Sequence, residues 1–558
     1  MSARYTALLA LATFPFLVAA QITTGGTPYS MRAGLGLHDV PTVQAARFDA
    51  AAAAADDARR QQEGKLPAYA RVMPVEAGLY DAGSWTDLPN GDRLWRLRVA
   101  SAGALATELY FSRFNLPANA SLYVYSTDGQ QVMGGFSAYN NRAEGTFTTG
   151  LLAGEASIVE YFEPAAVAGL GSLRVSGVGH AYRDVGEVTA SGACEVDVNC
   201  SEGDGWEAQR DAVVRISILD QGLSFWCSGS LVNNLQQDCK PYFLTALHCG
   251  EGTSAADFNQ WKFYFNYEKT GCGSGASFAN HFVVGATKRG SSNDGGGDQG
   301  SDFLLLEANA DSIPEDYEPY WAGWDVSGAG STGGKCIHHP DGDRKKISTF
   351  NGTLLNSSWG GVSGTHWRVI WSATANGNGV TEGGSSGSPL FNNAKRIVGT
   401  LTGGASCCTT NGCGPGTGLT QPDFYGKMSY HWASNPGPAS MRLKNFLDPQ
   451  ASGTLVLEGS YDPCGMYVGI RDADGPQVRL DVRPNPADGE VLVSLPMPVA
   501  DALLEVRDMG GRLLLQQAMP SKHGARVSTA SIEGGAYVLR VWSGGTVLAT
   551  APLIVVHP

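Results

Sequence analysis

Cysteine is absent from the first 193 residues of the chain, and lysine is absent between Lys65 and Lys240. Charged residues are scarce at 16%, and the net charge of −14 leaves no basic excess. Because nonspecific nucleic-acid binding needs a basic surface, this charge argues against nucleic acid as a partner. Beyond the N-terminus no apolar stretch is long enough for a transmembrane helix, so we expect no stable membrane span. The sequence also contains no internal repeat.

The first twenty residues have the pattern of a secretory signal peptide. Arg4 supplies a positive charge, Leu8–Val18 is apolar, and Val18–Ala20 is a small-residue cleavage site. We therefore expect an exported protein, and an exported chain meets oxidising conditions that favour disulfide bonds. Eleven cysteines follow from Cys194 onward. This odd number leaves at least one thiol unpaired or bonded to another molecule.

What the chain has in abundance is glycine, 73 residues, together with 43% hydrophobic residues, which favours turn-rich β structure with a substantial core. Its 558 residues predict several domains. We expect an Ala-rich helix around Ala45–Arg60, then strands such as Arg93–Val99 and Ser121–Tyr125. The predicted divisions are a signal peptide at 1–20, a cysteine-free segment at 21–190, a cysteine-rich β domain at 191–462, a linker at 463–478 and a last β domain at 479–558.

Three segments of the cysteine-rich region carry chemistry. Tyr242–Cys249 is an apolar strand that ends in His248, and Gly300–Glu307 places Asp302 at the start of another apolar strand. Gly383–Phe391 holds Ser386 in a glycine-rich turn. Serine is a poor nucleophile unless a base lies beside it, and that base needs a third group to fix its tautomer. Each residue alone is unremarkable, but the ordered triple predicts nucleophilic catalysis.

In the order His, Asp, Ser, these segments resemble the chymotrypsin family of serine proteases. The stretch from Cys194 to about Gly459 resembles, more closely, the bacterial lysyl endopeptidases. The matching pieces are Cys194–Gly205, Gly229–Asn234, Tyr320–Asp325, Ile337–Pro340, Gly379–Pro389 and Asp423–Lys427. The resemblance implies an all-β fold: a chymotrypsin-like double β-barrel protease domain, a mixed, mostly β pro-segment before it, and a small β-sandwich tail after it.

The resemblance also implies roles. His248 is the general base and then the general acid, Asp302 orients it, and Ser386 is the nucleophile. Ser386 is preferred over its neighbour Ser385 because it stands two residues after Gly384 and directly before a glycine. The backbone N–H groups of Gly384 and Ser386 then form the oxyanion hole.

Asp423 matches the aspartate at the floor of the family's specificity pocket. A buried carboxylate favours a substrate that brings a positive charge, so lysine and arginine both qualify. One departure concerns a family histidine that stacks on a tryptophan beside the active site. Trp359 matches the tryptophan, but we align the histidine position with Thr402, which leaves the tuning of rate and specificity open.

By the same resemblance, three disulfide bonds are expected. Cys194 pairs with one of Cys407, Cys408 or Cys413, of which we take Cys408. The other two bonds are Cys200–Cys272 and Cys227–Cys249. Cys239–Cys336 is a guess for a further bond.

We expect no cofactor and no metal. A zinc site from Cys407, Cys408 and Cys413 is disfavoured, because the spacing is not that of a known finger and export favours oxidation. The acidic loop Asn293–Asp298 is an alternative calcium site, although a mobile surface loop is preferred. No His-Glu-x-x-His motif of zinc peptidases is present.

Arg183 is the last basic residue before Cys194. A strictly lysine-specific enzyme is therefore unable to cut itself at the end of the pro-segment. Either arginine is tolerated in self-processing or another protease performs the maturation.

The last eighty residues resemble the C-terminal sorting domain of the type IX secretion system. The resemblance rests on Val482–Pro486, Val491–Leu495, Leu504–Gly511 and Gly535–Val541. It implies contact with the secretion machinery and export across an outer membrane to the exterior or the cell surface. The chain departs from the pattern by ending without the common basic residue, and a plain adhesion module is the alternative.

The sequence thus predicts a secreted, monomeric serine endopeptidase that acts on proteins and peptides and cuts after basic residues, with lysine preferred. Two alternatives are a catalytically silent binding protein on the protease scaffold and an adhesin whose flanking segments matter more.

Overall fold

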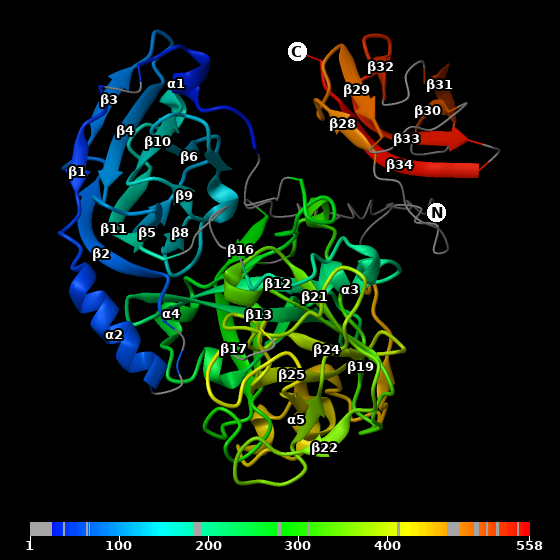
Figure 1. Cartoon of the computed structure of the whole chain (residues 1–558). Coiled ribbons are helices and arrows are strands. Elements are labelled where there is room, and N and C mark those ends of the chain that lie inside the picture. The colour runs from blue at the N-terminus through cyan, green and yellow to red at the C-terminus, as the bar shows by residue number, and fades with distance from the viewer. Residues whose placement is uncertain are drawn as a thin grey trace, which may run out of the picture. The chain divides into compact units, whose positions relative to one another are not determined.

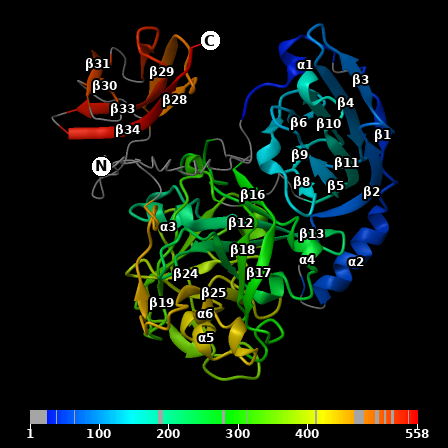
Figure 2. The ribbon, with the colours of Figure 1, turned by 180° about the vertical axis from the view of Figure 1, so that it is seen from behind.

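The structure is a computed structural model of the whole chain (Figures 1 and 2). It describes residues 25–36, 39–62, 65, 67–183, 191–275, 281–310, 312–409, 413–465, 480–495, 502–508, 512–519, 524–543 and 546–557. The predicted signal peptide lies outside these residues. The chain divides into two units, Met1–Tyr467 and Val468–Pro558. No helix among the described residues is long and apolar enough to cross a membrane.

The predicted Ala-rich helix is present as α2, Ala50–Gln62. Alanine has the highest helix propensity, and the Asp49 carboxylate accepts a bond of 2.9 Å from Ala52 N at the start of the helix. Ala53 and Asp57, four positions apart, form the buried face. Eleven strands and a short helix make up the rest of this N-terminal segment. They are α1 (Tyr29–Arg32), β1 (Thr42–Gln44), β2 (Ala70–Gly78), β3 (Ser84–Asp87), β4 (Arg93–Ala100), β5 (Ala106–Asn115), β6 (Ser121–Ser126), β7 (Val132–Phe136), β8 (Phe147–Thr148), β9 (Leu152–Ala153), β10 (Ala156–Glu163) and β11 (Ser172–Ala181).

These strands form two sheets. One has the order β1-β4-β10-β6-β7, with β3 also on β4. The other runs β2-β11-β5-β8 and continues into the next part of the chain, because β2 pairs with β13. The predicted strands at Arg93 and Ser121 are therefore confirmed as β4 and β6.

The first barrel of the cysteine-rich region is antiparallel, with the strand order β16-β15-β12-β13-β14-β18-β17. Its strands are mostly buried, as expected for apolar runs of β-branched and aromatic residues, and only β17 has an exposed middle. The elements are α3 (Glu207–Ala212), β12 (Val213–Asp220), β13 (Leu223–Val232), β14 (Tyr242–Thr245), α4 (Ala255–Phe258), β15 (Lys262–Tyr264), β16 (Phe282–Val284), β17 (Ala286–Ser291) and β18 (Leu304–Ala308).

The second barrel has the order β21-β20-β24-β25-β26-β23-β22. A separate hydrophobic cluster around Trp367, Trp371 and Tyr425 fills it, and another around Trp324 and Leu305 lies between the two barrels. The elements are β19 (Trp324–Asp325), β20 (Gly334–His338), β21 (Lys346–Phe350), β22 (Leu355–Ser357), β23 (His366–Val369), β24 (Pro389–Asn392), β25 (Ile397–Gly404), β26 (Asp423–Lys427), α5 (Met428–Ala433), α6 (Lys444–Leu447) and β27 (Val456–Leu457). The fold is the chymotrypsin-like pair of barrels that the resemblance implied.

The second unit, described by itself, has two small sheets with the orders β28-β29-β32 and β31-β30-β33-β34 around one apolar core. This agrees with the predicted small β-sandwich. Its strands are β28 (Asp481–Arg483), β29 (Glu490–Ser494), β30 (Leu503–Asp508), β31 (Leu513–Ala518), β32 (Gly524–Ser528), β33 (Gly535–Ser543) and β34 (Thr546–Val555).

Five disulfide bonds join ten of the eleven cysteines. The bonds are Cys194–Cys408, Cys200–Cys272, Cys227–Cys249, Cys239–Cys464 and Cys407–Cys413. The structure thus contains the three bonds that the resemblance implied. The guess of a Cys239–Cys336 bond is wrong: Cys336 is a buried free thiol, and burial raises its pKa to about 12.

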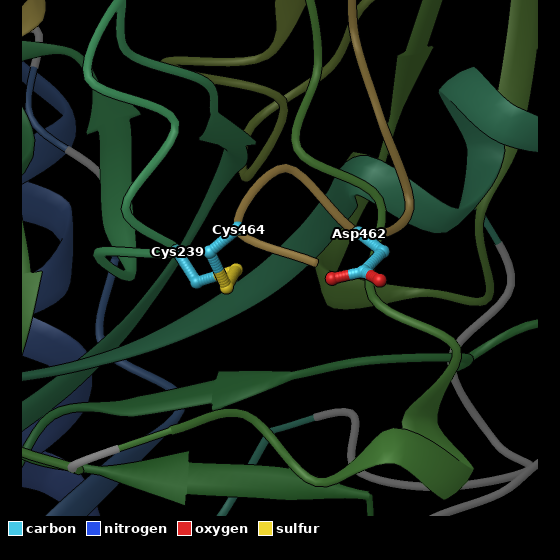
Figure 3. A group of neighbouring side chains, drawn as sticks. All are labelled: Cys239, Asp462 and Cys464. Atoms are coloured by element: carbon cyan, nitrogen blue, oxygen red, sulfur yellow. A yellow bond between two sulfur atoms is a disulfide. The ribbon is translucent and has the colours of Figure 1, made fainter. Parts of the chain in front are cut away.

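Cys239 instead bonds to Cys464, which lies within the predicted linker, and Asp462 lies beside this bond (Figure 3). The two sulfur atoms are joined to each other, so this group of three side chains offers a carboxylate but no thiolate. The Asp472–Pro476 stretch of the predicted linker lies outside the described residues.

Candidate active site

His248 and Asp302 lie side by side at the ends of neighbouring strands. β14 ends at Thr245 and β18 begins at Leu304, and these two strands pair in register. His248 follows in a short 3-10 turn, where its ring Nδ1 lies 2.7 Å from Asp302 Oδ2. The backbone N–H of His248 donates to Asp302 Oδ1 at 3.0 Å. The strand pairing therefore brings together two residues that are 54 positions apart.

The contact between His248 and Asp302 shifts the pKa of both side chains. Burial alone would lower the pKa of His248, but the charge of Asp302 and the hydrogen bond outweigh it and raise that pKa above the ordinary value. Burial likewise works to raise the pKa of Asp302, yet its partners, His248 above all, hold it below the ordinary value. The Asp302 side chain is fully buried, whereas the His248 side chain is 29% exposed. The pair is thus a buried carboxylate that supports a solvent-accessible imidazole.

Asp302 has an unusual backbone, with φ at +57°. Such a conformation is uncommon for a residue with a side chain and is held only by its surroundings. Asp294 stabilises this conformation, because its buried carboxylate accepts hydrogen bonds from the Asp302 N–H at 2.8 Å and from the Ser292 hydroxyl at 2.7 Å. The loop Asn293–Asp298 is therefore packed onto the site through Asp294, and the preferred prediction of a mobile surface loop is wrong for this residue.

Thr402 lies on the other side of Asp302. The Thr402 side chain hydrogen-bonds the Asp302 carboxylate, and its Oγ1 lies 2.9 Å from His366 Nε2. A carboxylate only accepts, so the threonine hydroxyl donates to Asp302 and accepts from the His366 Nε2–H. Burial lowers the pKa of His366 to about 4, so its ring is neutral. Thr402 is thus buried and engaged with the carboxylate rather than open to a substrate.

Ser386 lies in a turn that two left-handed glycines shape, Gly384 with φ at +86° and Gly387 with φ at +79°. Ser386 is partly exposed, whereas Ser385 is fully buried and its hydroxyl lies 2.8 Å from His338 Nδ1. This difference agrees with the choice of Ser386 as the nucleophile. The N–H groups of Gly384 and Ser386 donate to no acceptor in the described part of the chain.

β13 and a disulfide bond connect the turn that contains Ser386 to the segment that contains His248. Ser228 N donates to Ser386 O at 2.9 Å, and Cys249, next to His248, lies with its Sγ 3.8 Å from the same oxygen. The Cys227–Cys249 bond fastens these two segments together. No hydrogen bond between the His248 ring and the Ser386 hydroxyl is present among the described residues, which is common for a site without substrate.

Asp423 opens β26 and is 1% exposed. Its Oδ2 accepts from Trp371 Nε1 at 2.6 Å, Thr381 Oγ1 at 2.7 Å and Ser406 Oγ at 2.6 Å. Burial raises the pKa of this carboxyl in spite of these hydrogen bonds. Oδ1 accepts from Ser406 N at 3.1 Å, and a Cβ placed on the exposed Gly404 would overlap it. Oδ1 therefore faces the exposed Gly404, where the chain carries no side chain.

Trp359 is 42% exposed and packs edge-on against Phe424, with ring centroids 5.8 Å apart. A Cβ placed on Gly403 would lie 2.9 Å from the Trp359 ring, whereas the Thr402 hydroxyl lies 2.9 Å from His366 Nε2. The alignment of the family's histidine position with Thr402 stays a prediction, and Gly403 is a residue that lies under the Trp359 ring. A side chain is absent there, so the tryptophan face has no stacking partner at this position.

Residue types alone do not reveal Asp294 or His366. Asp294 stands in a glycine-rich run that reads as a loop, and His366 stands 36 residues before its partner Thr402. The available signal was weak: an aspartate eight residues before Asp302 in a loop leading to the same strand.

Comparison with known proteins gives two family matches. Residues 188–426 match the family described as the lysyl endopeptidase C-terminal domain, and residues 481–555 match the secretion system C-terminal sorting domain. A lysyl endopeptidase of Pseudomonas aeruginosa is 29% identical over 347 residues, which cover 58% of this chain and 71% of that protein.

Two solved structures are also similar. The thermostable serine protease AL20 from an extremophilic microorganism is 16% identical, covers 41% of this chain and 100% of its own, and has a TM-score of 0.28. The protease Anisep from Arthrobacter nicotinovorans is 17% identical, covers 39% of this chain and 90% of its own, and has a TM-score of 0.26.

The match to the secretion system sorting domain places the protein outside the cell or on its surface. The cysteine-rich region of this chain is a serine endopeptidase domain that is similar to the lysyl endopeptidase family, and the region that follows it is similar to the secretion system sorting domain.

Proposed function

We propose that this endopeptidase cleaves after lysine with a catalytic triad of His248, Asp302 and Ser386. The observation that carries the proposal is the 2.7 Å contact between His248 Nδ1 and Asp302 Oδ2, with Ser386 fastened beside the same histidine. Because Nδ1–H donates to the carboxylate, Nε2 is left as the acceptor that faces a reacting hydroxyl.

In the first step Ser386 Oγ attacks the carbonyl carbon of the scissile peptide bond, and its proton passes to His248 Nε2. The carbonyl oxygen becomes negative and takes hydrogen bonds from the N–H groups of Gly384 and Ser386, which have no other acceptor among the described residues. His248 then gives the proton to the leaving amine, and the C–N bond breaks. A water molecule hydrolyses the acyl-enzyme by the same route in reverse.

Asp423 supports lysine as the residue before the cut. Its carboxylate is buried with no cationic side chain hydrogen-bonded to it in the described part of the chain, and a buried charge is costly until a partner arrives. The lysine ammonium is a compact point charge that suits the single open oxygen, Oδ1, better than the planar fork of arginine.

We also propose the predicted division of the chain: a signal peptide at 1–20, a pro-segment at 21–190 that assists or restrains the protease, a protease domain at 191–462, and a sorting domain at 479–558 that is recognised by the secretion machinery. The mature enzyme acts on protein and peptide substrates with a single copy of the protease domain.

A digest of a mixed protein sample tests the catalytic proposal. The residue before every cut is identified with the wild-type enzyme and with Ser386→Ala. We expect cuts only after lysine, and none with the variant. Cuts after both lysine and arginine would keep the triad and refute the lysine preference. Equal cutting by Ser386→Ala, or no cutting at all, would refute the triad and favour a silent binding protein on this scaffold.

A further inference from the structure

The N-terminal segment and the first barrel share one hydrophobic core. The same cluster of buried side chains includes Leu109 and Phe111 of the segment and Trp226 and Phe263 of the barrel. The N-terminal segment and the first barrel therefore pack against each other directly.

A strand of the segment extends the barrel sheet. β2 pairs antiparallel with β13, with Arg71 opposite Leu223 and Ala70 opposite Ser224. The pairing includes a bond of 2.9 Å from Tyr69 N to Ser224 O. An uncovered edge of this kind is a ready site for strand addition, and here the chain covers it with its own segment.

A buried ion pair lies in this interface. Lys262 Nζ of the barrel is 2.7 Å from Glu108 Oε2 of the segment, and the two side chains are 1% and 0% exposed. The other carboxylate oxygen accepts from Tyr110 at 2.5 Å. Removing one partner of such a pair leaves the other charge buried and unpaired, so the pair makes the contact between these two surfaces specific.

Aromatic contacts add to this interface. The Tyr69 ring stacks on Trp226 with centroids 4.1 Å apart and planes 10° apart, and the Tyr69 hydroxyl lies 2.7 Å from Ser217 Oγ. Arg60 of α2 lies over the Phe225 ring, 4.2 Å from its centroid. Such rigid aromatic and arginine contacts are typical of strong interfaces.

The end of the segment is fastened to the segment itself. Arg183 Nη2 lies 3.0 Å from the buried Asp57 carboxylate of α2, and Tyr182 N donates to Tyr69 O at 3.0 Å. A chain break after Arg183 therefore leaves the contacts of the segment in place.

The interface does not use the catalytic groups. The partners of His248, Asp302 and Ser386 among the described residues all lie in the protease part of the chain, between residues 228 and 402. The segment instead contacts strands β12, β13 and β15 through Ser217, Ser224 and Lys262.

From these contacts we propose that residues 25–183 stay bound to the first barrel after the chain is cut before Ser191, so that the cut enzyme is a complex of two chains held by strand pairing and the Glu108–Lys262 pair. The proposal goes beyond the proposed function and does not depend on catalysis, because the interface is separate from the triad.

The test uses the full chain with Ser386→Ala, so that self-digestion is absent. The recognition sequence of a site-specific viral protease is inserted between Arg183 and Ser191, and the purified protein is cut there without denaturant. Size-exclusion chromatography at micromolar concentration then follows the two pieces. We expect one peak that holds both, and a dilution series gives their dissociation constant. Immediate separation into two peaks would overturn the proposal.

Variants of the cut protein test the ion pair. Glu108→Gln and Lys262→Met should each weaken the complex by about 100-fold or more, and the double variant should weaken it less than the two single effects combined. Glu76→Gln is the matched control, because Glu76 is 69% exposed and pairs with Arg174 within the segment; its effect should stay within about 2-fold. An effect of Glu108→Gln no larger than that of the control would refute the role of the pair. The uncut variants are first checked for a cooperative unfolding transition. If a variant fails to fold, the chromatography of the cut protein with an unmodified interface still decides the main proposal.

Discussion

Asp423→Asn is the sharpest probe of the proposed specificity pocket. Asparagine has the same shape as aspartate but no charge, and its amide nitrogen has no free pair to accept a hydrogen bond. In the wild type three side-chain donors reach Oδ2, and Oδ1 faces the open side at Gly404. The variant therefore retains acceptors for these donors on one side and presents a neutral amide to the incoming ammonium.

The expected loss follows from the burial. A lysine ammonium that enters beside a carboxylate 1% exposed forms a desolvated pair, and removing one member of such a pair costs about 3–5 kcal/mol. This corresponds to about 10²–10⁴-fold in kcat/KM for a lysyl substrate. The assay compares peptide amides that differ only at the residue before the cut: lysine, arginine and the uncharged isostere norleucine.

We expect Asp423→Asn to lose kcat/KM for the lysyl substrate while the low rate on norleucine is unchanged or rises. A matched control is Asp325→Asn, a carboxylate in the same domain whose Oδ1 accepts from Ser327 at the surface. An equal loss on all three substrates would show that the variant damages the fold, and an unchanged lysine preference would refute Asp423 as the charge that selects it.

Other perturbations test the rest of the site and one disulfide bond. Thr402→Val removes the hydroxyl bonded to Asp302, and kcat should fall about 10-fold with little change in KM in steady-state assays; an unchanged kcat would contradict the role of this bond. His248 must be neutral to accept a proton and its pKa is raised, so kcat/KM should rise with pH through a midpoint above about 6.5. Asp302→Asn removes the charge that raises the pKa of His248, so the midpoint of the pH profile should move to lower pH while kcat falls by about 10⁴-fold. An unchanged midpoint would contradict the role of Asp302 in raising this pKa. Gly404→Ala should displace the Asp423 carboxylate and abolish lysine preference, whereas Gly352→Ala, with open space around it, should not. Replacing both Cys239 and Cys464 by alanine should lower the free energy of unfolding by about 2–4 kcal/mol in denaturant titrations.

The proposed triad could be predicted from the sequence because each member stands in a local motif. His248 precedes a cysteine after an apolar strand, Asp302 precedes another, and Ser386 lies between glycines. The strands themselves follow from apolar runs of β-branched and aromatic residues, so the barrels were predictable once the order of the motifs was recognised.

The remaining parts depend on contacts between residues far apart in the chain. Thr402 reaches Asp302 across 100 positions, and the partner of Cys239 is 225 residues away. Periodicity and spacing carry no information on such contacts, which is why the Cys239–Cys336 guess failed. Sequence reasoning also does not separate the neighbours Thr402 and Gly403 beside Trp359, because successive residues of a strand point to opposite faces.

The Cys239–Cys464 bond closes a covalent ring whose circumference includes His248, Asp302 and Ser386. The sorting domain begins only after this closure. A force on the tail, as when a chain is drawn through a secretion pore by its C-terminus, therefore passes at Cys464 to Cys239, between β13 and β14 of the first barrel, and does not detach the last strands of the domain one by one. The three proposed catalytic residues thus lie within a disulfide-closed loop that removal of the tail does not open.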